Sequence, residues 1–414
     1  MDGLSLKFTD NLTKAEQLDI AHLAYLAEEA DKDCCNKVTG QKRNLSIIQR
    51  EDVPSKGVPL RRLKSLYAAL VMLAFQVFPG VAAEDKLSIT ISRPINGYMS
   101  LFLGNGRYVY LDGIIDRQAP SRLENFLKSN EIQYNSSVVL NSAGGNLISG
   151  IEIGRIIRKY GLSTVVGVKD AQPEYDSIKS GICMSACTAA FLGGKFRTLG
   201  GGSKFGVHRF AFQARGDGDA DAAQMLSAIV TKYMKEMDID VELFRLWTLA
   251  GSTEILELDS GQLENLNVVN NGFERPKWTI EGNNNLIYLK GERDTIYGIN
   301  KFIIYCTPAS VPLLHIIFDP QGRADEVMQH KQNDLIIDSE HIKVTAVKKE
   351  ITNGWFNAIY RLNNKLIRAI SLAKSVGMIV RPTSEAPNFL GFNHLPVSGG
   401  EQKIRSYLSG CRAN

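Results

Sequence analysis

The feature that most constrains the fold is an alternation of short apolar runs and amphipathic segments in the middle of the chain. Residues 138–140 form a continuous apolar run that ends at Asn141, and isoleucines recur at helical spacing over 147–160. Strands that alternate with helices of this length indicate βα units and a largely parallel sheet, so we expect an α/β domain over 87–275. The expected strands are 87–93, 98–103, 107–115, 138–141, 164–168 and 204–208, and the expected helices are about 120–129, 147–160, 219–237 and 240–250, with another beginning near Ser185.

The pattern changes after Lys277, where short apolar segments are separated by polar turns. This spacing is typical of a small all-β domain, a sandwich in particular. We therefore expect a smaller, mostly-β domain over 277–414, with Ile367–Val376 as its one helix. The expected strands contain NLIYLKG, KFIIYCT, LLHIIFD, DLIIDS, IKVTAV and FNAIYRL.

Composition places the chain among ordinary globular proteins. Of its 414 residues, 44% are hydrophobic and 22% are charged, which excludes disorder for most of its length. The net charge of +4 includes no long basic run, so no nucleic-acid partner is indicated. Six cysteines are too few for a disulfide scaffold, and none has zinc-site spacing. We expect neither a metal nor another cofactor.

The strongest hydrophobic segment, residues 66–83, has the layout of a secretory signal. Basic residues precede it, Pro79-Gly80 ends its apolar run, and the small residues Val81-Ala82-Ala83 stand where a signal peptidase cuts. The sequence thus predicts a signal peptide or signal-anchor helix over 56–83. A buried core helix is the remaining interpretation.

The position of this segment is unusual because residues 1–55 precede it. In one interpretation, translation starts near Val58. In the other, residues 65–83 remain uncleaved as a membrane anchor, and residues 1–55 form a short helical appendage without evident chemistry. Both export interpretations place the main body outside the cytoplasm: periplasmic, secreted or membrane-anchored.

Two motifs with small residues follow predicted strands, where open α/β sheets place their sites. In N-S-A-G-G, Gly144 and Gly145 let the backbone approach a ligand and direct N–H groups towards it, although a plain turn would also suit them. In G-I-C-M-S-A-C, Ser185 stands at the start of a buried helix, where the N–H of Ala186 is free. These features predict a nucleophile beside an oxyanion hole, or merely a capping serine between small buried residues.

The third motif, G-V-H-R, places His208 at the end of a short strand. A serine hydroxyl is inert at neutral pH without a base, and His208 would supply one for Ser185. A lone histidine at a strand end is more often structural, so its significance comes from the other two motifs. Cys183 or Cys187 as the nucleophile is a weaker alternative.

In this order, N-S-A-G-G, C-M-S-A-C and G-V-H-R resemble the proteolytic subunit of the Clp protease, ClpP, and the ClpP/crotonase superfamily; they look closest to a branch of exported bacterial proteins. The resemblance covers about 107–270. It implies a spiral of ββα units and a peptide or protein substrate. The implied roles are Ser185 as nucleophile, His208 as general base, and an oxyanion hole of backbone N–H groups from Gly144 or Gly145 and from Ala186.

The sequence departs from the ClpP pattern at several positions. Ala143 replaces a proline, cysteines flank the serine, and Arg209 replaces a glutamine after the histidine. The third triad residue would come about fifty residues after His208, which makes Glu254 the nearest acid and Asp259 the second choice. A Ser-His dyad without an acid, or an inactive relative, stays open. No lysine occupies the G-V-H-R motif, which disfavours Ser-Lys chemistry.

We therefore predict an exported serine hydrolase, a peptidase in first place, with a β-rich accessory domain. The alternative is a catalytically inactive ClpP-fold protein that acts as a binding or interaction module. Crotonase-like acyl-thioester chemistry ranks third because coenzyme A suits the cytoplasm. Relatives of ClpP form rings, so the resemblance also raises an oligomer, although no residue pattern requires one. In an oxidising compartment Cys306 and Cys411 would pair and fix the C-terminus.

Overall fold

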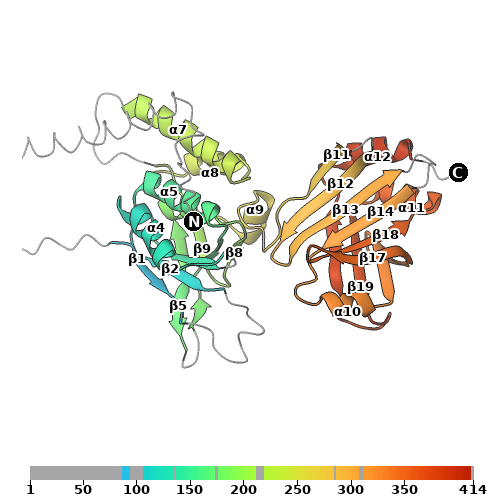
Figure 1. The fold of residues 1–414 in the computed structure, drawn as a ribbon. Coiled ribbons are helices and arrows are strands. Elements are labelled where there is room, and N and C mark those ends of the chain that lie inside the picture. Colours follow the sequence, from blue (N-terminus) through green and yellow to red (C-terminus); the bar gives the residue numbers. More distant parts are fainter. Residues whose placement is uncertain are drawn as a thin grey trace, which may run out of the picture. The chain divides into compact units, whose positions relative to one another are not determined.

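The computed structural model has a mixed α/β fold (Figure 1), and its buried apolar residues form two hydrophobic cores. The first core draws on residues between Leu87 and Val269, and the second on residues between Trp278 and Cys411. The predicted strand at 98–103 and everything predicted for 1–83 lie outside the described residues. In the described part of the chain, no helix combines the length and apolar character needed to cross a membrane. The structure describes residues 86–93, 106–134, 136–172, 176–210, 219–283, 286–306 and 312–411.

A five-stranded sheet in the order β1-β2-β3-β4-β8 carries the first core. Strand β1 pairs antiparallel with β2, and the remaining neighbours are parallel. The central strand reads SVVLN, and its apolar residues are fully buried because both faces of the sheet are covered. The strands are β1 (Ser88–Ile91), β2 (Tyr108–Asp112), β3 (Ser137–Asn141), β4 (Ser163–Val166) and β8 (Arg197–Leu199).

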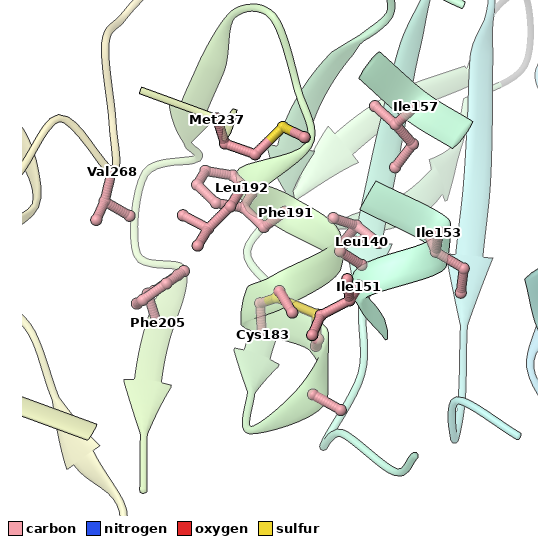
Figure 2. Packing of buried hydrophobic residues seen from close by; sticks show 14 of the residues in the cluster. Leu140, Ile151, Ile153, Ile157, Cys183, Phe191, Leu192, Phe205, Met237 and Val268 are labelled. Atoms are coloured by element: carbon pink, nitrogen blue, oxygen red, sulfur yellow. A yellow bond between two sulfur atoms is a disulfide. The ribbon is translucent and has the colours of Figure 1, made fainter. Parts of the chain in front are cut away.

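Helices α5 and α6 pack against each other beside this sheet. The side chain of Asn146 begins α5 by accepting a hydrogen bond from the N–H of Ser149, and the buried residues of this helix face the core. Every residue of α6 is buried, and Phe191 and Leu192 belong to the same hydrophobic core as Ile151 of α5 (Figure 2). The described helices of this part are α4 (Ala119–Ser129), α5 (Leu147–Lys159), α6 (Ala186–Leu192), α7 (Asp219–Glu236), α8 (Glu242–Leu249) and α9 (Ser260–Asn265).

Two smaller sheets complete the first part, and several of their strands were not predicted. The three-stranded sheet has the order β10-β9-β7, in which β7 and β9 are parallel. A two-stranded hairpin joins β5 and β6. These strands are only two to four residues long, too short for a recognisable period. They are β5 (Val168–Ala171), β6 (Asp176–Lys179), β7 (Ile182–Met184), β9 (Lys204–Val207) and β10 (Leu256–Glu257).

The second core lies between two antiparallel sheets, of order β11-β12-β13-β14-β18-β17 and β16-β15-β19-β20. Alternate residues of the long strands point inwards, as in β14, where Leu314, Ile316 and Phe318 are buried. The strands are β11 (Lys277–Asn283), β12 (Leu286–Thr295), β13 (Gly298–Cys306), β14 (Pro312–Phe318), β15 (Gln332–Ile337), β16 (Glu340–Lys343), β17 (Ala346–Thr352), β18 (Trp355–Arg361), β19 (Ser375–Arg381) and β20 (Leu390–Pro396).

The prediction of one helix at Ile367–Val376 is wrong in extent and in number. The helix, α11 (Asn364–Leu372), ends earlier, and Val376 belongs to β19, whose apolar run is almost entirely buried. A short apolar run does not distinguish a buried strand from a helix, which explains the error. The described residues also contain α10 (Ala324–Gln329) and α12 (Glu401–Ser409), which contribute Val327, Ile404 and Leu408 to the same core.

Candidate active site

The three sequence motifs meet at the carboxyl ends of β3, β7 and β9. Ser142, the residue after β3, donates its N–H to the carbonyl of Ile182 at 2.9 Å and accepts the N–H of Met184 at 3.0 Å. These bonds join the end of β3 to β7. Because β7 pairs in parallel with β9, all three segments end at one edge. This is where α/β sheets usually place their sites.

Ser185 and His208 directly follow the paired ends of β7 and β9. Met184 lies opposite Gly206 in the register, and the N–H of Ser185 donates to the carbonyl of Gly206 at 3.0 Å. His208 comes two residues after Gly206, and both candidate side chains are half-buried. The structure therefore brings the predicted nucleophile and the predicted base to the same edge of the sheet.

The backbone of Ser185 is strained. Its φ of 56° and ψ of −126° lie in a region that side chains other than glycine rarely adopt. The strand-to-helix turn is therefore sharp, as in the turns that expose a nucleophilic serine in other hydrolases. Its carbonyl accepts both the N–H and the hydroxyl of Thr188, at 2.9 and 2.5 Å. The turn is thus held from both sides.

The glycine turn lies directly against Ser185. Gly144 has a φ of +114°, and a Cβ added to it would lie 2.6 Å from the Cβ of Ser185 and 3.2 Å from the nitrogen of Ala186. Gly145 has a φ of +134°, and a Cβ added to it would clash with the backbone of Ile115. Glycine is therefore required at both positions, by conformation and by close approach.

The backbone donors of this turn differ in availability. The N–H of Gly144 donates to the hydroxyl of Ser142 at 3.1 Å and is therefore occupied. The N–H groups of Gly145 and Ala186 have no acceptor among the described residues. Of the predicted oxyanion donors, Gly145 and Ala186 are thus the free pair, and Gly144 instead shapes the turn.

The predicted acids do not contact His208. Nδ1 of His208 is buried and has no hydrogen-bond partner among the described residues. Glu254 is exposed and lies two residues before Leu256 of β10, which pairs with Val207 of β9. Its carboxylate forms no hydrogen bond with Nδ1 of His208. Asp259 accepts the N–H of Gln262 at 2.9 Å and caps α9, which gives it a structural role. Ser185 and His208 thus lie at one sheet edge, and no described acid bonds to Nδ1 of the histidine.

The cysteines around the serine form a disulfide that the sequence analysis missed. Cys183 is bonded to Cys187, with 5.2 Å between their Cα atoms, and both are fully buried. This bond is visible in Figure 2 beside Cys183. The interpretation of either cysteine as the nucleophile is therefore wrong, because neither carries a free thiol. The spacing of four residues across a strand-to-helix turn was the available signal.

The structure also pairs Cys306 with Cys411, as expected from the sequence, with 5.9 Å between Cα atoms. This bond joins the end of β13 to the end of the described chain, outside the site. Within the described ranges, no cluster of three or more His, Cys, Asp or Glu side chains has the arrangement of a metal site.

A salt bridge anchors the loop behind the glycine turn. Arg122 donates hydrogen bonds of 2.8 and 2.6 Å to Asp116, and these hold the pKa of that carboxyl well below its usual range. Asp116 adjoins Ile115, whose N–H donates to the carbonyl of Gly144 at 2.8 Å and whose carbonyl accepts the N–H of Asn146. The ion pair thus supports the turn through one neighbouring residue.

A pocket of about 340 Å³ adjoins the glycine turn. Ile114 and Ile182, which line it, are both exposed despite being apolar, and Ile148 and Ile255 are exposed on neighbouring segments. A larger hollow, of about 700 Å³, lies along α7 and shares no residue with the site. The smaller pocket borders the N-S-A-G-G motif through Asn141, Ser142 and Ala143, although neither Ser185 nor His208 lines it. Its lining residues are Lys86, Asp112, Gly113, Ile114, Asn141, Ser142, Ala143 and Ile182.

Comparisons with known proteins add little to this geometry. No family model and no curated protein matches the chain. Among solved structures, ClpP1 from Listeria monocytogenes is similar over 39% of this chain and 88% of its own, with 14% sequence identity and a TM-score of 0.30. At that level the likeness concerns at most the fold, and it does not bear on the catalytic residues.

Proposed function

We propose that this protein is a serine hydrolase whose nucleophile is Ser185 and whose general base is His208. The observation that carries the proposal is the strained turn at Ser185, whose N–H donates to the carbonyl of Gly206 on β9, the strand that His208 directly follows. A residue in this backbone conformation costs about 1–3 kcal/mol, and such residues cluster at functional sites. A serine that only capped a helix would not need it.

The chemistry follows from these groups. His208 removes the hydroxyl proton of Ser185 as the oxygen attacks a substrate carbonyl, and the carbonyl oxygen becomes negative. The N–H groups of Gly145 and Ala186 stabilise that charge, each contributing roughly a hundredfold or more in rate. His208 then returns the proton to the leaving group as the bond to that group breaks. Water next loses a proton to His208 and attacks the acyl-enzyme, and the proton passes to the Ser185 oxygen as the acid is released.

A dyad without an acid on His208, as the described residues have it, would be a slow enzyme. In triads, the acid fixes the imidazole tautomer, and losing its function lowers the rate by about 10⁴-fold. Nδ1 of His208 has no such partner among the described residues. We therefore expect a Ser-His dyad that reacts over minutes to hours with an activated probe.

Exposed apolar side chains favour a peptide or protein substrate with apolar residues. Ile114, Ile148, Ile182 and Ile255 are 36–45% exposed, and all lie on segments that adjoin the glycine turn, Ser185 or His208. Exposed apolar groups gathered around one site usually mark a binding surface. We assign the pocket beside the turn to a substrate side chain, within a ClpP-like spiral of ββα units.

Two disulfides support an exported location. Both Cys183–Cys187 and Cys306–Cys411 require an oxidising compartment, since cytosolic thiols are kept reduced. This agrees with the export signal expected at 56–83. We propose that the folded protein acts outside the cytoplasm.

Labelling of the oxidised full-length chain with a fluorophosphonate tests the proposal. We expect one adduct, located at Ser185 by peptide mass spectrometry, and no adduct in Ser185→Ala. His208→Gln should label at least a hundredfold more slowly. The matched controls are Ser180→Ala and His341→Gln, which change exposed residues outside the site and should label at the wild-type rate.

Two outcomes contradict the proposal. One is a folded wild-type protein that takes up no probe, which would favour a binding module instead. The other is labelling that persists in Ser185→Ala. A peptide library incubated with wild type and Ser185→Ala then tests the preference for apolar residues.

A further inference from the structure

A disulfide encloses the candidate nucleophile. Cys183 lies in β7 and Cys187 in α6, so their bond closes a ring that contains Met184, Ser185 and Ala186. The ring therefore includes both the proposed nucleophile and one proposed oxyanion donor. Both cysteines are 0% exposed, and the described hydrophobic core surrounds them (Figure 2).

The strained turn needs support from its surroundings, and the disulfide is the covalent support. The other supports are the bond from the Ser185 N–H to Gly206 and the two bonds from Thr188 to the Ser185 carbonyl. Each such hydrogen bond contributes about 1 kcal/mol net. The strain at Ser185, about 1–3 kcal/mol, is comparable to that sum. Without the disulfide, these hydrogen bonds would barely outweigh the strain, and the backbone of Ser185 would relax to an ordinary conformation.

We propose that the Cys183–Cys187 disulfide positions Ser185 and Ala186 for reaction, so that only the oxidised protein is active. The inference rests on the proposed function. The cysteines are positioning residues, because they act through the turn and do not touch the substrate.

Reduction would proceed by exchange with a dithiol. The S–S bond breaks, two thiols form at Cys183 and Cys187, and the dithiol becomes a disulfide as it supplies two electrons and two protons. Two unbonded thiols occupy more space than a bonded pair. A close-packed interior has no room for them, so the backbone of 183–187 must move.

The second disulfide provides a matched control. Cys306–Cys411 closes a sequence separation of 105 residues and encloses no site residue of the first part. Removing it ensures that an effect of the dithiol does not come from Cys306–Cys411. The double variant Cys306→Ala/Cys411→Ala leaves Cys183–Cys187 as the only disulfide among the described residues.

The experiment compares that control variant, oxidised and dithiol-reduced, with Cys183→Ala/Cys187→Ala in the full-length chain. We expect fluorophosphonate labelling of Ser185 to fall at least tenfold on reduction and to recover on reoxidation. The Cys183→Ala/Cys187→Ala variant should show the same loss, while oxidised Cys306→Ala/Cys411→Ala labels within threefold of wild type. Hydrogen exchange at the Ser185 amide should accelerate on reduction, while the amides of β3 stay protected.

The outcomes separate this inference from the proposed function. If the oxidised protein does not label at all, the proposed function fails, but faster exchange at the Ser185 amide on reduction would still support the positioning role. Equal labelling and equal exchange in both redox states would overturn the inference. Global unfolding on reduction would also overturn it, because the bond would then stabilise the fold and not the turn.

Discussion

Replacing Gly144 by alanine should damage the site, because the added methyl group would meet Ser185 itself. The added Cβ would lie 2.6 Å from the Cβ of Ser185 and 3.0 Å from the Met184 carbonyl oxygen, whereas carbon atoms in contact are about 3.5–4.0 Å apart. Ser185 would have to move by roughly 1 Å. A displacement of that size in a reacting group costs on the order of a hundredfold in rate.

The same change should lower stability by about 2–5 kcal/mol. A left-handed backbone costs alanine about 1–2 kcal/mol, and overpacking a tight site costs about 1–3 kcal/mol. Gly144 combines the two, since its φ is +114° and its neighbours are backbone atoms or the Cβ of Ser185. None of these is the flexible end of a long side chain, so the clash has no easy relief.

Denaturant unfolding and probe labelling measure the two effects, and two glycines separate their causes. Gly322 has a φ of +76° and nothing within 4 Å of an added Cβ, so Gly322→Ala should show the backbone cost alone. Gly201 also has open space around it and no left-handed φ, so Gly201→Ala should be neutral. If Gly144→Ala is no less stable than Gly322→Ala and labels within threefold of wild type, this reasoning is refuted.

Two further predictions concern the supports of the site. The pKa of Asp116 is lowered by Arg122, so its stabilisation is present above its unfolded pKa of about 3.9 and is lost as the pH falls from there towards the folded value. Urea unfolding should show wild type more stable than Asp116→Asn by about 1–2 kcal/mol at pH 6, with a smaller gap at pH 3; a gap independent of pH would exclude the charge as its cause. Tyr233 is fully buried, and its hydroxyl donates to the Ala189 carbonyl in α6 at 2.7 Å, so Tyr233→Phe should cost about 1 kcal/mol in thermal or denaturant unfolding. An unchanged or raised midpoint would show that this bond contributes nothing.

The sequence located most regular elements because their signals are local. The helix expected at 147–160 is α5, Leu147–Lys159, since its apolar period and the cap at Asn146 both lie within one segment. The predictions failed where a strand was too short to show a period, or where the surrounding structure decided between strand and helix. Strand β7 has three residues, and β19 shares its apolar run with the end of a predicted helix.

The candidate site divides in the same way. Small residues after a strand, a serine before a buried helix and a histidine at a strand end were visible as patterns, so Ser185 and His208 could be chosen in advance. The sequence could not show which backbone N–H group is free, because this depends on Ser142, whose hydroxyl accepts the N–H of Gly144. That bond depends on a turn geometry that residue types alone do not fix.

By itself, the sequence determined many of the longer strands and helices and the residue types capable of hydrolysis, because periodicity and capping act within a few residues. Only the tertiary structure decided that Cys183 bonds to Cys187, that Nδ1 of His208 has no hydrogen-bond partner among the described residues, and that β7 and β9 end side by side. The physical reason is that these features depend on distances between groups, and folding fixes those distances through packing of the whole core.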